Sequence, residues 1–302
     1  MIDIDPQQIP TRDLHQFILG TVAPRPIAFV STIDEKGRPN LAPYSFFNAF
    51  SSNPPIVVFS SNRRVTNNTT KDTLYNVRAT GEVVINMVNF DIVRQMAVCS
   101  VEFPQGISEF EQSGLTPIPS QVVRPPRVKE SPAHLECKVR DIITLGTHGG
   151  AGHLIICEVV RLHIAKEVVD ERGRIDPHKI DLMGRLGRAY YVRASGDAVY
   201  TIVQPVTKMV IGYQSLPEHV RHSHVLTGNH IGLLAGLHKR PSPQEVLKLM
   251  KEDPHIQQIL SKKENPIEAL HRYAAQLLDQ PQPLREKAGQ VVWIPEYLTP
   301  SS

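Results

Sequence analysis

The sequence lacks several features that would assign it to a class at once. No apolar stretch approaches the roughly 20 residues that a membrane-spanning helix needs. The first residues, MIDIDPQQIPTRDLHQ, hold no basic segment followed by an apolar run. Both absences favour a cytoplasmic protein that does not enter a membrane. The 33 basic residues are dispersed among 30 acidic ones, with a formal net charge of +3. This balance predicts no basic face for nucleic acid, so we expect no nucleic-acid partner.

Cysteine is also scarce. The three cysteines, Cys99, Cys137 and Cys157, are far apart, lie in apolar or strand-like surroundings and form no C-x-x-C pair. They are typical of reduced, buried thiols, and a catalytic thiol is the less favoured alternative because none has a neighbouring activating signature. Histidines gather in an H-x-x-H-x-H pattern from 219 to 224, with His230 beyond it. This spacing matches no familiar zinc framework, so we expect capping or solvated histidines and no metal.

Short apolar runs rich in β-branched residues fill the chain from Ile27 to about Ile164, and Pro, Gly or Asn residues bound them. Helices are predicted only at about 71–79 and 91–99. No G-x-G-x-x-G follows a strand, and no long helices alternate with the strands, so a Rossmann fold is disfavoured. The pattern predicts a mainly β fold with helices, built as a closed or split β-barrel. The predicted strands cover 27–33, 39–44, 54–60, 82–88, 135–145 and 153–164.

The sequence pattern changes from strand-like to helical after about Tyr200. Ser242-Pro243-Gln244-Glu245 has a helix N-cap, a proline at the first helical position and a glutamate placed for a capping box. Asn265-Pro266-Ile267-Glu268 repeats this arrangement, and Asp253-Pro254 predicts a shorter helix between the two. The sequence therefore predicts a domain over 10–200 and a helical C-terminal extension over 201–302. One face of the last predicted helix is apolar, with Ile267, Leu270, Ala274, Leu277 and Leu278.

This apolar face is too continuous to stay in water. The chain also has no long Gly/Ser linker before the extension. We therefore expect the extension to pack on the barrel or on a dimer partner, where it would restrict access to a functional site.

Polar side chains follow the predicted strands between Thr21 and Thr73. Residues able to hydrogen-bond a ligand come first, and Arg64 and Lys71 add charge for an anion. A helix predicted to begin near Lys71 would add free backbone N–H groups. The segment predicts a cradle for a flat, phosphorylated cofactor, and the alternative is an ordinary antiparallel sheet with polar loops. The hydrogen-bonding candidates are Ser45, Asn48, Ser60, Ser61 and Asn62.

The order of seven motifs carries a resemblance over about residues 10–195. They are VAPRPIAFVST, N-x-APYSFFN, SSNPPIVVFS, Lys-Asp-Thr before a helix, GEVVINMV, AGHLIICEVV and RLGRAYYVR. Together they resemble the flavin reductase-like FMN-binding split-barrel family, particularly its flavoredoxin and nitrilotriacetate monooxygenase component B-like branch. The resemblance implies an FMN-binding split β-barrel that forms a homodimer. It also implies hydride transfer from NADH or NADPH through FMN to free flavin, a monooxygenase partner or another acceptor.

Two alternatives stay open at this point. One is a flavin-dependent oxidase or reductase that acts on a small organic substrate. The other is an electron carrier of the flavoredoxin type, which has no nicotinamide site of its own. The sequence also favours FMN over FAD, because a phosphate site suits a terminal dianion and FAD would need room for an adenylate beyond it.

The resemblance also implies site residues. Arg25, Pro26, Ile27 and Ala28 would line one side of the ring system, and Ser45, Phe46, Phe47 and Asn48 the next wall. Tyr191 would reach the flavin pocket or the dimer seam. The ribityl and phosphate groups would be held by Ser60, Ser61, Asn62, Arg64, Lys71, Asp72 and Thr73.

His153 is the catalytic candidate, since it lies where the family carries Gly-Asp-His, although this chain reads Gly150-Ala151-Gly152-His153. Each role has a structural alternative. Arg25 could brace a loop, and Phe46 and Phe47 could be core or interface aromatics. Tyr191 could be a core aromatic, and His153 could tie two loops together.

Overall fold

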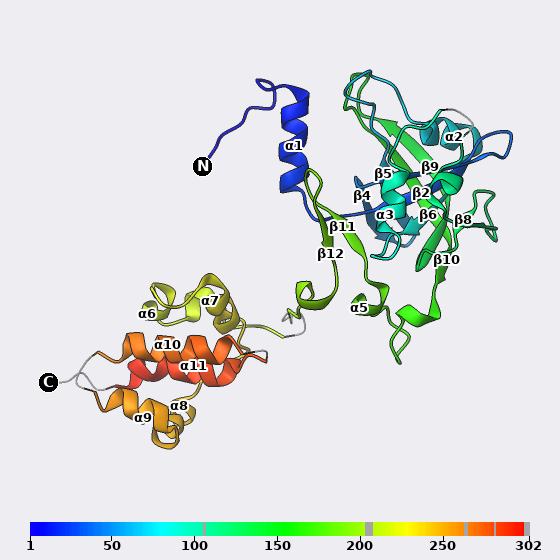
Figure 1. Ribbon diagram of the computed structural model, residues 1–302. Coiled ribbons are helices and arrows are strands. Elements are labelled where there is room, and N and C mark those ends of the chain that lie inside the picture. Colours follow the sequence, from blue (N-terminus) through cyan, green and yellow to red (C-terminus); the bar gives the residue numbers. More distant parts are fainter. Residues whose placement is uncertain (105–106, 203–207, 263–264, 281, 299–302) are drawn as a thin grey trace. The chain divides into compact units, whose positions relative to one another are not determined.

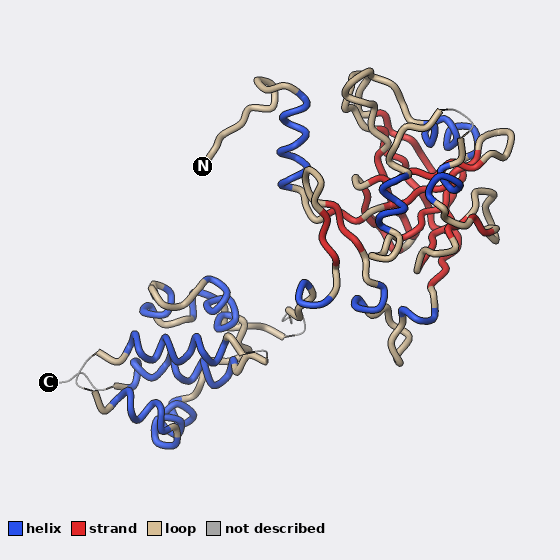
Figure 2. Tube along the Cα trace, viewed as in Figure 1, coloured by secondary structure: helices blue, strands red, loops and turns tan. Residues whose placement is uncertain are grey.

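The computed structural model describes residues 1–104, 107–202, 208–262, 265–280 and 282–298. The chain divides into two compact units, Met1–Tyr200 and Thr201–Ser302 (Figure 1). We call them the β unit and the helical unit, because strands lie only in the first and helices dominate the second among the described residues (Figure 2). No helix in these ranges is both long and apolar enough to cross a membrane.

The β unit is built on one seven-stranded antiparallel sheet. Its strand order, β3-β2-β6-β9-β10-β5-β4, places segments that are distant in sequence side by side. The sequence predicted six of these strands but did not separate the seventh, β4, from the loop before it. The strands are β2 (Ala28–Ile33), β3 (Pro39–Tyr44), β4 (Phe47–Ser52), β5 (Pro55–Ser60), β6 (Glu82–Met87), β9 (Ala133–Thr144) and β10 (His153–Ile164).

Strand β2 joins two apolar cores. Ala28 and Val30 belong to one core and Phe29 to the other, and all six residues of the strand are buried. Successive side chains of a strand point to opposite faces, so the two cores lie on the two sides of the sheet. Helix α2 (Asp72–Thr80) adds Leu74 to the first core. Gly81 ends this helix with φ at 66°, a left-handed conformation that glycine adopts without strain.

The other elements of the β unit are short. The helices predicted near 71–79 and 91–99 correspond to α2 and α3, whereas α1 was not predicted. A second sheet has the order β1-β11-β12, and β7 pairs with β8. These elements are α1 (Thr11–Thr21), β1 (Arg25–Pro26), α3 (Val93–Val98), α4 (Glu109–Ser113), β7 (Pro117–Ile118), β8 (Arg127–Val128), η1 (Lys166–Val168), α5 (Pro177–Ile180), β11 (Met183–Arg185), β12 (Tyr191–Arg193) and η2 (Gly196–Ala198).

The helical unit contains η3 (Tyr213–Ser215), α6 (Glu218–Arg221), α7 (Gly228–Ala235), α8 (Pro243–Glu252), α9 (Pro254–Leu260), α10 (Ile267–Leu278), α11 (Arg285–Trp293) and η4 (Ile294–Tyr297). The predicted capping box of Ser242 and Glu245 is present at α8, and Asp253 caps α9. The start of α10 differs from the prediction. Its N-cap is Pro266, and Asn265 accepts one hydrogen bond from the Ile267 N–H at 3.1 Å without forming a capping box.

The apolar face of α10 is covered inside the helical unit. Leu270, Ala274, Leu277 and Leu278 are buried in a core to which the other helices of the unit contribute, including Val246 of α8 and Val292 of α11. The expectation that this face needs a surface outside the extension was wrong, because α10 packs against its own neighbours. Packing of the helical unit on the β unit or on a dimer partner stays a prediction.

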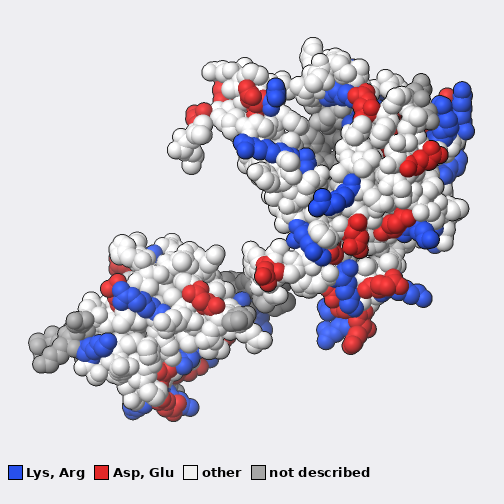
Figure 3. All heavy atoms as spheres, viewed as in Figure 1, with Lys and Arg blue, Asp and Glu red and all other residues white. Residues whose placement is uncertain are grey.

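Basic and acidic side chains are interspersed on the face of each unit that Figure 3 shows. This distribution agrees with the near-balanced composition of 33 basic and 30 acidic residues.

Candidate functional site

An extended segment before α2 carries the predicted anion-binding residue Lys71. The Lys71 backbone has φ −85° and ψ 154°, and its ammonium nitrogen lies 4.8 Å from the centroid of the Tyr44 ring. Burial lowers the pKa of Lys71, and the nearby charge of Arg64 lowers it further. No side chain caps the N-terminus of α2, which begins at the next residue. A cation and free backbone N–H groups therefore lie together, as an anion site requires.

Two hydroxyl groups beside this segment form no hydrogen bond of good geometry among the described residues, although the hydroxyls of Thr73 and Ser61 lie near enough to Tyr44 to lower its pKa. They are the Tyr44 hydroxyl and the Ser61 Oγ, on side chains that are 5% and 1% exposed. Burial raises the pKa of Tyr44 to about 12, so this phenol stays protonated. Leaving a buried polar group unpaired costs about 1–3 kcal/mol. The donor set therefore fits a ligand with polar atoms and an anionic end.

A small cavity brings three of the predicted ring-site residues together, Ile27, Ser45 and Tyr191. Its volume is about 120 Å³. The Arg185 guanidinium lies 4.5 Å from the Tyr191 ring centroid, so the ring forms a cation–π contact as well as a wall. The other lining residues are Pro43, Tyr44, Met96, Ser100 and Arg185.

Arg25 braces the chain beside this cavity. Its buried guanidinium donates to the carbonyl oxygens of Leu19 at 2.6 Å and Leu186 at 3.1 Å, and to the Ser45 Oγ at 3.4 Å. Burial lowers the pKa of Arg25, with Arg185 as the second cause. These contacts correspond to the bracing alternative, in which Arg25 positions Ser45.

The neighbouring candidates differ in exposure. Pro26 is partly buried in β1, and Ala28 is fully buried in the core, so its side chain presents no surface to a ligand. Phe46 lies 5.9 Å from the Arg25 guanidinium, whereas Phe47 packs against the first core of the sheet. Asn48 is exposed, and its side-chain oxygen accepts from the Ala49 N–H at 2.8 Å. Asn48 is thus the most accessible of these residues.

His153 ties two segments together. Its ring is 2% exposed, and Nδ1 lies 3.0 Å from the carbonyl oxygen of Ser61. The Ser60 Oγ donates to the Asn62 side-chain oxygen at 2.6 Å, so both predicted ligand residues bond each other. A Cβ on Gly152 would lie 2.6 Å from the Ser60 Oγ, which explains the glycine. We therefore assign the glycines of this loop to close packing, and the catalytic role of His153 stays a prediction.

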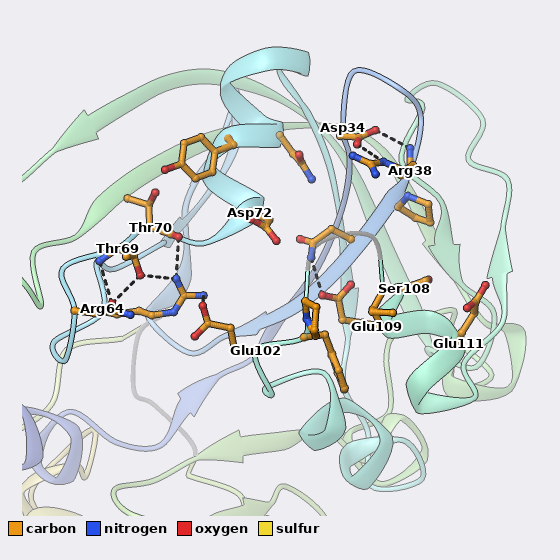
Figure 4. Close-up of a pocket in the computed structure, with 18 residues that line it drawn as sticks. Asp34, Arg38, Arg64, Thr69, Thr70, Asp72, Glu102, Ser108, Glu109 and Glu111 are labelled. Carbon is orange, nitrogen blue, oxygen red and sulfur yellow. Dashed lines mark hydrogen bonds and ion pairs between the residues drawn. The ribbon is translucent and has the colours of Figure 1, made fainter.

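A second cavity of about 1000 Å³ lies between α2, β3 and the segment before α4 (Figure 4). The predicted residues Arg64 and Asp72 line it. Arg64 pairs with Glu102 at 2.9 Å and donates to the Thr69 Oγ1 at 2.8 Å. Its remaining lining residues are Asp34, Arg38, Pro39, Asn40, Asn67, Thr69, Thr70, Tyr75, Asn76, Glu102, Phe103, Pro104, Ile107, Ser108, Glu109 and Glu111.

A buried polar network forms one wall of the large cavity, and the sequence did not predict it. The Asn40 side chain donates to the Glu109 Oε1 at 2.9 Å and accepts from the Thr73 hydroxyl at 2.9 Å. Glu109 also accepts from the Leu41 N–H at 3.1 Å, and burial raises the pKa of this carboxyl group. Thr73 is fully buried in this network, so it supports the wall of the site. Glu109 is 69 residues from Asn40 in the chain, and no local motif could have linked them.

The histidines singled out in the sequence lie in the helical unit. His230 bonds Asp279 at 2.8 Å, and His219 stacks on His271 with centroids 5.2 Å apart. Among the residues that the structure describes, no group of three or more His, Cys, Asp or Glu side chains could hold a metal ion.

Comparisons with known proteins concern the β unit. Residues 20–179 match the family model described as flavin reductase like domain. An uncharacterized protein of Aquifex aeolicus is 39% identical over 184 residues, which are 61% of this chain and 91% of the relative.

Three solved structures are similar to the chain. Nitrilotriacetate monooxygenase component B from Bacillus cereus has a TM-score of 0.61 and 32% identity, over 68% of this chain and 98% of that chain. The 2-nitrobenzoate 2-nitroreductase NbaA from Pseudomonas fluorescens has a TM-score of 0.59 and 30% identity, over 67% and 96%. A structure with a split barrel domain from Shewanella frigidimarina has a TM-score of 0.57 and 26% identity, over 68% and 100%. The predicted split β-barrel with a helical C-terminal segment is thereby confirmed.

Proposed function

The chain belongs to the flavin reductase-like domain family, in which FMN binding is typical, and on that premise we propose that it is an FMN-dependent oxidoreductase. It takes hydride from NADH or NADPH and passes electrons to free flavin, a monooxygenase partner or another acceptor. One observation carries the proposal. The Tyr44 and Ser61 hydroxyls are buried beside Lys71 and form no hydrogen bond of good geometry among the described residues, which leaves polar groups and a cation available to a bound ligand.

Different residues of the site bind different parts of FMN. Lys71, Arg64 and the N-terminus of α2 hold the phosphate, and the hydroxyls of Tyr44 and Ser61 bond the ribityl chain. The small cavity receives the ring system. When bound, FMN supplies the redox chemistry, and the chain has to hold it, orient it and control what reaches it. The apolar cavity residues exclude water from this end of the site.

The proposal includes a homodimer. The small cavity of about 120 Å³ is below the roughly 300–1000 Å³ usual for a ligand pocket, so it takes only part of a flavin. The edge strand β4 carries Phe50, which is 69% exposed, and Leu162 of β10 is also exposed. A second copy would cover apolar side chains and complete the pocket. Light scattering should give a dimer mass, and a monomer mass at all concentrations with flavin bound would contradict it.

Anaerobic mixing tests the activity. The FMN-loaded protein is mixed with NADH or NADPH in the absence of oxygen, and the flavin absorption band is followed. We expect rapid bleaching with at least one donor. Bound FMN that neither donor bleaches, but that dithionite does, would identify an electron carrier of the flavoredoxin type.

One comparison favours a second candidate, in which the acceptor is a small organic molecule. The similar Pseudomonas fluorescens structure is a 2-nitrobenzoate 2-nitroreductase. Turnover of NADH with 2-nitrobenzoate, compared with free FMN as acceptor, separates the two candidates. Turnover with the nitro compound alone would favour the small-molecule reductase.

A further inference from the structure

Two arginines lie opposite each other beside the small cavity. Arg25 of β1 and Arg185 of β11 are direct partners in the antiparallel pair that these two strands form. Directly opposed side chains lie on one face of a sheet, about 4.5–5.5 Å apart at Cβ, and like charges in such a pair are destabilising. Burial lowers the pKa of Arg25, and the charge of Arg185 lowers it further. An anionic group beside the two guanidiniums would offset this repulsion.

The chain supplies acceptors to Arg25 but, among the described residues, none to Arg185. Arg25 donates to three backbone carbonyl oxygens, which include that of Leu186 at 3.1 Å. Arg185 forms no hydrogen bond and no ion pair within the part of the chain that the structure describes. Arg193 of the same hairpin differs, because its Nη2 lies 2.6 Å from the Oδ2 of Asp181. The donors of Arg185 are therefore available to a ligand.

The position of Arg185 is fixed in two ways. Its guanidinium carbon lies 4.5 Å from the ring centroid of Tyr191, the residue that it faces in the β11–β12 pair (Figure 1). The negative face of an aromatic ring attracts a cation. The backbone is also closely packed, since a Cβ on Gly184 would lie 2.9 Å from the Val192 Cγ1 and 3.2 Å from the Pro24 Cβ. The guanidinium is thus held at the wall of the cavity before any ligand binds.

The lining of the small cavity suits the polar end of a flavin ring. Ser45 and Ser100 add hydroxyl groups to the Arg185 guanidinium, while Ile27 and Met96 are apolar. No aspartate or glutamate is among the described residues that line this cavity. The pyrimidine end of a flavin carries carbonyl oxygens and ring nitrogens, which accept hydrogen bonds from such donors. A cation without a carboxylate favours a ligand group that carries or gains negative charge.

We propose that Arg185 sets the redox potential of the bound flavin by donating to the pyrimidine end of its ring. This inference rests on the proposed function, in which the ring lies at the small cavity and the phosphate at Lys71. Hydride transfer from NADH or NADPH, which leaves as NAD⁺ or NADP⁺, brings two electrons and one proton, so the ring gains one negative charge. A fixed guanidinium stabilises this charge, and reduced FMN is therefore bound more tightly than oxidised FMN.

The midpoint potential of the bound flavin tests this role. The full-length, FMN-loaded protein is reduced slowly beside a reference dye, as wild type, Arg185→Gln and Arg188→Gln. The potential depends on the ratio of the dissociation constants of reduced and oxidised FMN. We expect this ratio to rise about tenfold in Arg185→Gln, which lowers the potential by about 30 mV for two electrons. Arg188→Gln removes an exposed guanidinium between β11 and β12, outside the cavity lining, and should keep the wild-type potential.

Titrations with FMN in each redox state separate this role from simple binding. Arg185→Gln should weaken the binding of reduced FMN about tenfold more than that of oxidised FMN. An equal loss in both states would make Arg185 a binding residue only and would overturn the proposal, as would equal potentials in Arg185→Gln and Arg188→Gln. A wild type that does not bind oxidised FMN would instead overturn the proposed function.

The wild type gives a second test, which does not depend on the folding of a variant. If the reduced ring keeps its negative charge beside Arg185, one proton is taken up with two electrons, and the potential falls by about 30 mV per pH unit. Uptake of two protons gives about 59 mV. We expect the smaller slope between about pH 5.5 and pH 7.

The titratable neighbour of Arg25 is His15. Burial lowers the pKa of His15, and the charge of Arg25 lowers it further, which disfavours a charged imidazole in this range. A slope closer to 59 mV per pH unit would show a neutral reduced ring and would overturn the proposal.

Discussion

The two units of the chain differ in how far apart in sequence their contacting residues lie. The helical unit is assembled from helices with local caps, such as the capping box of Ser242 and Glu245, and its buried side chains form one core. The β unit pairs strands that are far apart in sequence, as β6 with β9, and its sheet separates two cores. Both cavities described above lie in the β unit. The difference teaches that the helical unit covers the apolar face of α10 with its own helices, while the β unit keeps cavities open for a ligand.

Buried polar groups occur in both units, and each unit holds some without a partner among the described residues, such as His219 Nε2 and Arg221 Nε in the helical unit. In the helical unit the His271 ring is bonded at both nitrogens, to Ser223 at 2.8 Å and to His219 at 3.0 Å. In the β unit the Tyr44 and Ser61 hydroxyls at the candidate site have no partner among the described residues. Unpaired buried groups are costly, so their presence at a cavity favours ligand binding over a purely structural role.

The largest effect should follow from opening the core of the helical unit. Leu270→Ala removes a side chain that is fully buried, which should cost about 2–5 kcal/mol of unfolding free energy. The chain has one tryptophan, Trp293, which is buried in the same core, so its fluorescence reports on this unit. FMN affinity should not change. Leu247→Ala, at an exposed position of α8, is the control, and a parallel loss of FMN binding in Leu270→Ala would show that the units are coupled.

Acid should destabilise the helical unit through His271. Burial first, and then the charge of His219, lowers the pKa of His271 to about 4. Glu296, 3.6 Å from His219, is the carboxylate that faces this pair. An unfolded histidine titrates near pH 6.5, so the unfolded state takes up the proton first as pH falls. Stability should be complete above about pH 6.5 and decline by up to about 3 kcal/mol toward pH 4.

Urea titrations followed by Trp293 fluorescence at several pH values measure this decline. His271→Gln should flatten the pH dependence, although it also removes hydrogen bonds. His238→Gln, at an exposed position, should retain it. An unchanged slope in His271→Gln would assign the acid sensitivity to other groups.

Lys71→Ala tests the polar end of the candidate site. The loss of a charge-assisted contact should weaken FMN binding at least about tenfold, or about 1.4 kcal/mol. Fluorescence titration with FMN measures it, with Lys129→Ala at an exposed position of the β unit as the matched control. Trp293 fluorescence should show no change in the helical unit. Unchanged FMN affinity would remove Lys71 from the phosphate site.

The smallest effect concerns a single helix cap. Ser242→Ala removes the hydroxyl that accepts from the Glu245 N–H at 3.2 Å. It should lower the stability of the helical unit by about 1 kcal/mol, as read from Trp293 in urea. Ser261→Ala, at the exposed end of α9, should have less effect. Equal losses in the two variants would mean that the capping box does not stabilise α8.

The sequence predicted most of the fold because its signals are local. Strand runs such as 82–88, the helix begun by Ser242 and the glycine that ends α2 each depend on neighbouring residues. The prediction failed where partners are distant. The apolar face of α10 was assigned to an outside surface, because nothing nearby in sequence reveals that α11 and α7 cover it.

The predictions for the candidate site were limited in the same way, by partners that are distant in sequence. Motifs drew attention to Ser60, Asn62 and His153, yet these side chains bond neighbouring parts of the fold. The sequence could not predict the role of Glu109 of α4, which comes from its hydrogen bond with Asn40 of β3. Chemistry at a site requires side chains to meet, and residue types alone do not fix which of them have partners.

The sequence by itself determined most of the elements, the family and the residue types available for a phosphorylated cofactor, because propensity, capping and motif order act over short distances. The tertiary structure decided which polar groups stay unpaired, where the two cavities lie, and that the helical unit covers its own apolar face. The physical reason is that burial and hydrogen-bond satisfaction depend on groups brought together from distant parts of the chain.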